Sequence, residues 1–181
     1  MAFSIEQFKG NFADGGARPN LFRVRLNFPA TVGGIENQGA FLVRSAQIPA
    51  ATIAQIDVPY FGRQVRVAGN RTFEPWTVTV LNREDFDVRN ALELWMATIN
   101  SHNTNIQGVA SNSLSAYKSD AFVDHFGKTG DGDVIAEYKF EGLFPTELSS
   151  IDLSWDTNDA IEEFTATFAY DYWTHAGVDV S

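Results

Sequence analysis

The 181-residue sequence contains no cysteine, which excludes disulfide bonds and thiolate metal sites. It has no apolar run that approaches the ~20 residues of a membrane span. Its first residues do not show a basic segment followed by an apolar one, so we expect no signal peptide. The chain is therefore expected to remain in the cytoplasm in which it is made.

Basic residues are also scarce. The chain has 13 Lys and Arg against 23 Asp and Glu, a formal net charge of −10 and a pI of about 4.6. This balance argues against a general nucleic-acid surface and against docking on anionic membranes, because both need clustered cations. Apolar residues make up 44% of the chain and aromatic residues 13%, which is enough for the core of one domain.

The residue patterns that usually accompany catalysis are missing. Residues 127–129 imitate the end of a phosphate-binding loop, but Phe122 stands where the motif requires glycine. Residues 156–158 imitate the start of a calcium loop, but Ala160 stands at the third ligand position. The three histidines lack ligand spacing. We predict no enzyme, no catalytic or metal-binding residue and no cofactor.

Alternation of apolar and polar residues is the strongest structural signal, and it predicts an antiparallel β fold. The predicted strands cover residues 21–28, 40–45, 76–81, 121–126, 134–141, 148–155 and 161–173. The first two are expected to pair as a hairpin. One amphipathic helix is predicted over about residues 83–100, with Asn82 as its N-cap and Asp85 three residues later. The fold class is a β-sandwich or rolled barrel with one flanking helix.

Two terminal segments are predicted to lie outside the β domain of residues 20–173. Residues 1–19 carry scattered phenylalanines and a glycine pair, and are interpreted as an N-terminal arm in which Ile5 and Phe8 share one side of a short helix. Residues 174–181 are predicted to form a flexible C-terminal tail.

A third segment, residues 48–70, is predicted to project from the domain. Pro49 and Pro59 bracket an extended stretch that is too apolar for a solvated loop and too rich in proline for a central strand. Such a stretch is typical of an arm that another surface covers.

Six blocks of sequence carry a family resemblance. They occupy residues 17–22, 66–73, 76–80, 141–146, 153–159 and 171–173. The most specific block reads Arg-Val-Ala-Gly-Asn-Arg-Thr-Phe at 66–73 and is followed by Trp-Thr-Val-Thr-Val at 76–80. With these blocks in this order, the chain resembles the tail tube proteins of T4-like contractile-tailed bacteriophages, over about residues 17–173.

This resemblance implies a structural virion protein. Six copies would form a ring whose sheets join into one barrel around a lumen, and rings would stack into a rigid tube. The implied partners are copies of the chain itself, a sheath protein outside, tape measure protein and DNA passing through the lumen, and baseplate and tail terminator proteins at the ends. The implied location is the virion tail, with assembly in the host cytoplasm. Such tubes resemble type VI secretion and pyocin tubes in fold.

The predicted arm supplies the candidate contacts between protomers. They are Ile48, Ile53, Ile56, Tyr60, Phe61, Arg63, Arg66 and Arg71. The three arginines stand out in an acidic chain and are expected to pair with carboxylates of neighbouring protomers; the alternative is a solvated strand face. A ring of six copies would carry a formal charge of about −60, which would repel DNA phosphates.

Two other functions fit the sequence. A tube of a phage-derived secretion or bacteriocin apparatus would need the same protomer. A monomeric carbohydrate-binding β-sandwich would use exposed aromatic residues such as Tyr172 and Trp173. Electron microscopy separates the last function from the others, because only a tube protein would form stacked rings.

Overall fold

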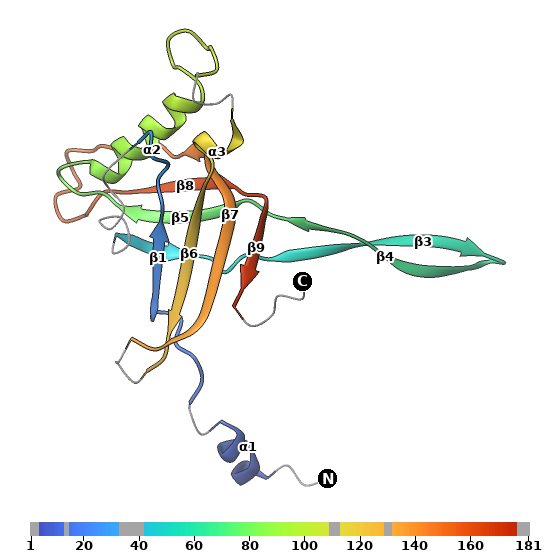
Figure 1. Cartoon of the computed structure of the whole chain (residues 1–181). Helices are drawn as coiled ribbons and strands as arrows, with labels where there is room; N and C mark the ends of the chain where they lie inside the picture. Colours follow the sequence, from blue (N-terminus) through green and yellow to red (C-terminus); the bar gives the residue numbers. More distant parts are fainter. Residues whose placement is uncertain (1–3, 13–14, 33–41, 109–112, 129–131, 177–181) are drawn as a thin grey trace.

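Seven strands form the body of the protein as two antiparallel layers that share one long strand (Figure 1). The computed structural model describes residues 4–12, 15–32, 42–108, 113–128 and 132–176. Its elements are α1 (Ile5–Asn11), β1 (Phe22–Leu26), β2 (Val43–Ala46), β3 (Ala51–Tyr60), β4 (Arg63–Phe73), β5 (Trp76–Leu81), α2 (Asp87–Ile99), α3 (Leu114–Tyr117), β6 (Ser119–Phe126), β7 (Val134–Leu148), β8 (Glu163–Ala169) and β9 (Tyr172–His175). The predicted mainly β, antiparallel fold class is confirmed.

The shared strand is β7, whose two halves pair with different strands. Its first half lies between β6 and β9, and residues 144–148 pair with β8. One layer therefore reads β1-β6-β7-β9 and the other β7-β8-β5-β2. Gly142 lies at the change of layer with a φ of +68°, where a Cβ would collide with the carboxylate of Asp171. The prediction that this strand ends at residue 141 is wrong, because the glycine bends the strand without ending it.

Aromatic side chains fill the space between the layers. Trp76 of β5 stacks on Phe140 of β7 with ring centroids 4.3 Å apart, and Phe168 of β8 lies 5.8 Å away. All three are buried, and the indole Nε1 of Trp76 donates to the carbonyl oxygen of Gln47 at 2.8 Å. Buried aromatic residues with satisfied polar atoms contribute much of the stability of a core.

The helix α2 covers one end of this core. Its buried residues, Val88, Ala91, Leu92 and Trp95, recur at helical spacing, as predicted for an amphipathic helix. The indole Nε1 of Trp95 donates to the carbonyl oxygen of Tyr117 at 2.7 Å, which ties α3 to the helix.

The predicted start of this helix is wrong. The backbone amide of Asn82 donates to the carbonyl oxygen of Glu162 at 2.8 Å, so Asn82 continues the β5 ladder instead of capping a helix. The cap position is Phe86, in the left-handed region with φ of 54° and without a side-chain cap hydrogen bond. Asp85 accepts a hydrogen bond from the amide of Asp87 at 3.3 Å, so it supports the turn before the helix.

The predicted hairpin between the first two strands is also wrong. β1 pairs with β6, and β2 pairs with β5 in the other layer. The physical reason lies in Phe28, which is buried and contacts Trp95 with ring centroids 5.7 Å apart. The chain therefore enters the core after β1 and does not return alongside it.

The last two predicted strands need correction. Residues 149–162 form no strand, although β7 and β8 lie on either side of them in the sequence. The predicted strand 161–173 is two strands, β8 and β9, which separate at Tyr170 and Asp171 and pair with different halves of β7. Between α2 and β6 the chain forms a further short helix, α3.

The structure describes parts of the two predicted arms and of the predicted C-terminal tail. β3 and β4 form a separate two-stranded sheet that projects far from the body, and α1 is held away from the body below β1 (Figure 1). Thr174 and His175, predicted to begin a tail, belong to β9 and pair with β7. The end of that tail, residues 177–181, lies outside the described residues.

Candidate assembly surfaces

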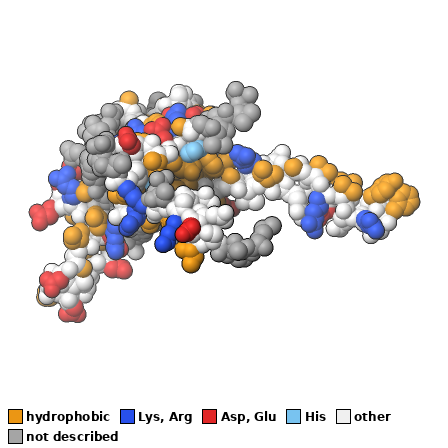
Figure 2. Space-filling model, turned by 90° about the horizontal axis from the view of Figure 1, so that it is seen from below, with side chains coloured by type: hydrophobic (Ala, Val, Ile, Leu, Met, Phe, Trp, Pro, Cys, Tyr) orange, Lys and Arg blue, Asp and Glu red, His pale blue; other side chains and the backbone are white. Residues whose placement is uncertain are grey.

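The hairpin of β3 and β4, residues 51–73, is exposed along nearly its whole length, and we call it the arm hairpin. Every residue from 51 to 68 is exposed. Phe61, at the turn, is 92% exposed, and its one ring contact among the described residues is with its neighbour Tyr60. Figure 2 shows hydrophobic side chains at the far end of the hairpin and basic side chains along it. An isolated two-stranded hairpin is at best marginally stable in water, which indicates that another surface supports this one.

The distal half of the arm hairpin has one apolar face and one polar face. The register places Ile56 opposite Val67 and Val58 opposite Val65 on one face. The other face carries Asp57 opposite Arg66, and Pro59 opposite Gln64. Because an apolar face on a strand pair normally packs on a core, and this face is exposed, it is a candidate interface.

The structure brings together most of the contact residues predicted from sequence. Ile53, Ile56 and Tyr60 lie on β3, Phe61 at the turn, and Arg63, Arg66 and Arg71 on β4; Ile48 precedes the hairpin and is exposed. Sequence reasoning missed Val58, Val65 and Val67, which complete the apolar face. The signal that would have found them is alternation on both sides of Gly62, which is the signature of a hairpin.

Two of the three arginines of the arm hairpin form no ion pair with another described residue. Arg66 Nε lies 3.7 Å from Asp57 Oδ1, at the margin of an ion pair, and its side chain is exposed. Arg63 and Arg71 have no ion pair within the described parts of the chain. The expected pairing with carboxylates of neighbouring protomers stays a prediction.

The N-terminal arm also presents apolar side chains. α1 buries no residue, and Ile5, Phe8 and Phe12 are exposed. Phe8 and Phe12 stack with ring centroids 5.7 Å apart, and Ser4 Oγ accepts from the amide of Gln7 at the start of the helix. The stacked rings make a second apolar surface outside the core.

The layer β1-β6-β7-β9 has two features that matter for assembly. Within the described residues its outer strands, β1 and β9, each pair on one side only, so each presents a free edge there. The face of this layer that points away from the core is charged, and its centre is Asp124, whose side chain is 0% exposed.

Asp124 holds two guanidinium groups. Arg23 donates to it through Nε and Nη2 at 3.1 and 2.8 Å, and Arg25 through the same two atoms at 2.9 and 2.7 Å. Arg25 Nη2 also donates to Glu137 at 2.8 Å. Burial raises the pKa of Asp124, but the hydrogen bonds from Arg25 and Arg23 outweigh it, so its pKa lies below the usual value.

A second charged group follows on the same face. Lys139 Nζ lies 2.9 Å from Glu141 and 3.1 Å from Asp120. The hydroxyl of Tyr172 donates to Glu141 at 2.6 Å. This bond and the one from Lys139 lower the pKa of Glu141, and the bond to Glu141 raises the pKa of Tyr172. Each cation on the strands of this face thus has a carboxylate partner.

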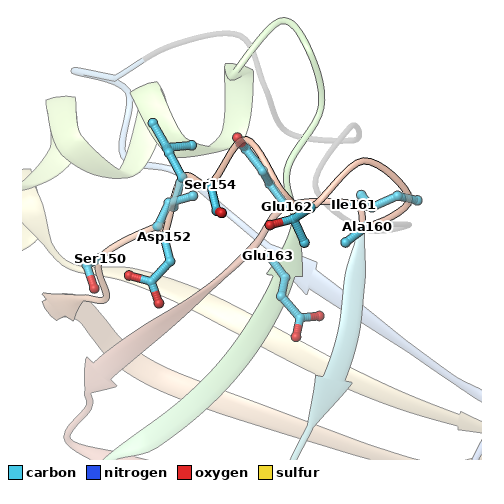
Figure 3. Close-up of a pocket in the computed structure, with 10 residues that line it drawn as sticks. Ser150, Asp152, Ser154, Ala160, Ile161, Glu162 and Glu163 are labelled. Atoms are coloured by element: carbon cyan, nitrogen blue, oxygen red, sulfur yellow. The ribbon is translucent and has the colours of Figure 1, made fainter.

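The segment between β7 and β8, residues 149–162, is the third exposed surface, and we call it the acidic loop. Trp155 is 99% exposed and Leu153 is 80% exposed. A cavity of about 360 Å³ lies between residues 150–154 and the stretch from Ala160 to Glu163 (Figure 3). Exposed large apolar residues beside a cavity indicate a contact surface.

The described residues offer no site for metal or membrane chemistry. No group of three or more histidine or acidic side chains that could hold a metal ion occurs among them. No helix in the same part of the chain is long and apolar enough to cross a membrane. Trp173, considered for carbohydrate binding, instead packs in the protein beside Phe73 and Tyr138, with ring centroids 6.3 and 5.7 Å away.

Comparison with known proteins identifies the family. The family model described as phage tail tube protein matches residues 17–176. The chain belongs to the phage tail tube protein family. It is 33% identical over 157 residues to tail tube protein gp19 of Enterobacteria phage T4, which covers 87% of this chain and 90% of that protein. It is 25% identical over 173 residues to the tail tube protein of Serratia phage KSP90, covering 92% and 94%.

Solved structures agree on the fold of this tail tube protein. The cap that terminates the anti-feeding prophage tube superimposes with a TM-score of 0.64 at 19% identity, covering 88% of this chain and 90% of that one. A chain of the PVC contractile injection system sheath–tube complex superimposes with a TM-score of 0.60 at 17% identity, covering 96% and 98%. These likenesses establish the fold.

Family membership decides several expectations. The tail tube proteins that match are structural, so the chain is not an enzyme, as predicted. As a phage tail tube protein it is a component of the virion. The matched range includes both layers, the arm hairpin and the acidic loop, and leaves α1 outside.

Proposed function

We propose that six copies of this chain form a ring, that rings stack into the inner tube of a contractile tail, and that DNA passes through the lumen during ejection. The observation that carries the proposal is the arm hairpin, which exposes an apolar face that the protomer itself does not cover. Copies of the same chain are the partners that a tube requires.

The free strand edges support the ring. β1 and β9 end the same layer on opposite sides, so β1 of one copy pairs with β9 of the next without either edge remaining open. Repeated around a closed ring, this pairing makes one continuous barrel.

The charged face of that layer then lines the lumen. Its opposite face is covered by the second layer and α2, so the charged face is the one left for the interior. Arg23, Arg25 and Lys139 are each engaged by carboxylates. DNA phosphates therefore meet few free cations on these strands, and the excess negative charge of the chain favours sliding over binding.

The remaining partners follow from the tube. A sheath protein surrounds it, tape measure protein occupies its lumen before DNA, and baseplate and terminator proteins end it. The solved relatives include a sheath–tube complex and a tube-terminating cap, which supports this arrangement. The sheath–tube complex comes from a contractile injection system, so a tube of a phage-derived secretion or bacteriocin apparatus is the second candidate function. Assembly of the phage tube takes place in the host cytoplasm.

The test changes one face of the arm hairpin at a time. Ile56, Val58, Val65 and Val67 are replaced together by threonine, which keeps the strand preference and removes the apolar face. The control replaces Gln55 and Gln64 of the polar face by threonine.

Negative-stain microscopy of the purified full chains provides the result. The control is expected to form tubes like the unmodified protein, and the apolar-face variant is expected to stay as small particles with an unchanged circular dichroism spectrum. The proposal would be contradicted if both variants formed tubes. It would also be contradicted if the control and the unmodified protein both failed to form them.

A further inference from the structure

The arm hairpin and the acidic loop carry opposite charge. The arm hairpin contains Arg63, Arg66 and Arg71 with Asp57 as its one acidic residue, in a chain whose net charge is −10. The acidic loop contains four carboxylates and no lysine or arginine, and Glu163 follows directly at the start of β8. Both surfaces also expose large apolar side chains.

Most charges on the two surfaces lack an ion pair with any other residue that the structure describes. Asp152, Asp156 and Asp159 have no ion pair in the described ranges, as Arg63 and Arg71 have none. Among the neighbouring carboxylates, Glu162 accepts from Asn82 Nδ2 at 3.0 Å and Glu163 pairs with Arg44. The three aspartates are the ones available to another molecule.

One protomer cannot bring the two surfaces together. β5 and β8 pair from Trp76 opposite Phe168 at one end to Leu81 opposite Glu163 at the other. The arm hairpin enters β5 at the first end and points away from the body, whereas the acidic loop enters β8 at the second end (Figure 1). A contact between them therefore requires two copies.

We infer that the arm hairpin of one copy docks on the acidic loop of another copy, with Arg63 and Arg71 facing Asp152, Asp156 and Asp159. The inference rests on the proposed tube and assigns the two halves of one of its interfaces. Because the two surfaces differ, the contact is head-to-tail, and a pair of copies keeps one free loop and one free hairpin for further copies.

The chemistry of the two surfaces fits this pairing. Arginine presents a planar fork of donors that matches a carboxylate. Asp152 lines the cavity together with Glu162 and Glu163 (Figure 3), and Asp156 and Asp159 belong to the same loop outside the cavity lining. The cavity volume of about 360 Å³ lies at the low end of the range of about 300–1,000 Å³ for ligand pockets, which suits a side chain of the hairpin tip. Trp155 and Leu153 add apolar area beside the charges.

The first test is a charge swap in the full chain. Replacing Arg63 and Arg71 by glutamate, or Asp152 and Asp156 by arginine, should raise the protein concentration needed for tube growth by at least about tenfold. A chain that carries both replacements should grow tubes at close to the original concentration, because attraction is restored with the signs reversed.

A matched control separates this contact from net charge. Replacing the exposed Glu84 and Glu147 by arginine changes the net charge as much as the swap in the acidic loop, and it should leave tube growth unchanged. Growth is followed by light scattering and electron microscopy at two salt concentrations, since screening weakens exposed charge pairs.

The second test uses the absence of cysteine from the chain. Gln64→Cys in the arm hairpin and Thr157→Cys in the acidic loop are both exposed positions. A short bismaleimide should link the double variant into a ladder of covalent oligomers, and neither single variant should give more than a dimer.

The outcomes distinguish this inference from the proposed function. If the unmodified protein forms tubes but the double swap does not recover growth and no ladder appears, the pairing is wrong and the tube remains. If the unmodified protein forms no tubes, the proposed function itself fails.

Discussion

Asp124 allows the sharpest prediction of stability, because its carboxylate is buried and holds two arginines. Asp124→Asn keeps the size of the side chain and one acceptor oxygen but removes the charge from four hydrogen bonds of 2.7 to 3.1 Å. Hydrogen bonds to charged groups contribute about 1.5–3 kcal/mol each. Arg23 and Arg25 are 36% and 37% exposed, so water replaces part of the loss. We expect a loss of about 2–4 kcal/mol in the free energy of unfolding.

The measurement is urea unfolding of the full chain, followed by circular dichroism at neutral pH and below the concentration of tube growth. The control is Asp120→Asn, a more exposed partner of Lys139 on the same face, for which we expect less than about 1 kcal/mol. If Asp124→Asn changes the free energy by less than about 0.5 kcal/mol, the charged cluster does not stabilise the layer.

The pH dependence of the same variant has a definite sign. The folded pKa of Asp124 lies below its usual value, so its stabilising effect is complete above the unfolded pKa of about 3.9. The effect is lost as the pH falls through the lower folded value. The difference in free energy of unfolding between the unmodified protein and Asp124→Asn should therefore be constant near neutral pH and shrink only in strong acid.

Three further predictions concern the body of the protein, and urea unfolding checks each. Gly142→Ala should lower the free energy of unfolding by more than about 1–2 kcal/mol, because the new Cβ would combine a left-handed φ with a collision with Asp171. Gly132→Ala, with a similar φ but open space around it, should lose only the backbone contribution. Equal losses in the two variants would contradict this reasoning. Phe168→Ala should cost about 3–5 kcal/mol, since its ring is fully buried. Glu163→Gln should cost less than about 1 kcal/mol, because its ion pair is exposed.

The spacing of apolar residues along the sequence predicted those strands and helices whose formation depends mainly on neighbouring residues. Alternation at 76–81 predicted β5 with its inward residues, and apolar spacing predicted the buried face of α2. Two prolines that bracket an apolar stretch marked the segment that forms the arm hairpin. In each case the decisive information lies within a few neighbouring residues.

Pairing between distant strands could not be predicted in the same way. Alternation at 40–45 marks a strand but does not say whether its partner is β1 or β5. Ile151, Leu153 and Trp155 alternate as in a strand, yet the last two face solvent. Both edges of β8 are already occupied by β7 and β5, so no place remained for another strand beside it. The sequence alone does not show that both edges of β8 are occupied.

The positions of the candidate contact residues could be predicted in part from the sequence. The arginines and several apolar residues of the arm hairpin were identified, but its division into two faces depends on the turn at Phe61 and Gly62, which sets the register. The charged cluster around Asp124 was not identified, because its members come from β1, β6 and β7 and meet only in the folded sheet.

Cryo-electron microscopy of the purified full chain tests the central claim most directly. Helical reconstruction should give stacked rings of six copies each, in which residues 51–73 of every copy are buried against other copies. Single particles at all concentrations, or rings whose hairpins point into solvent, would contradict the account.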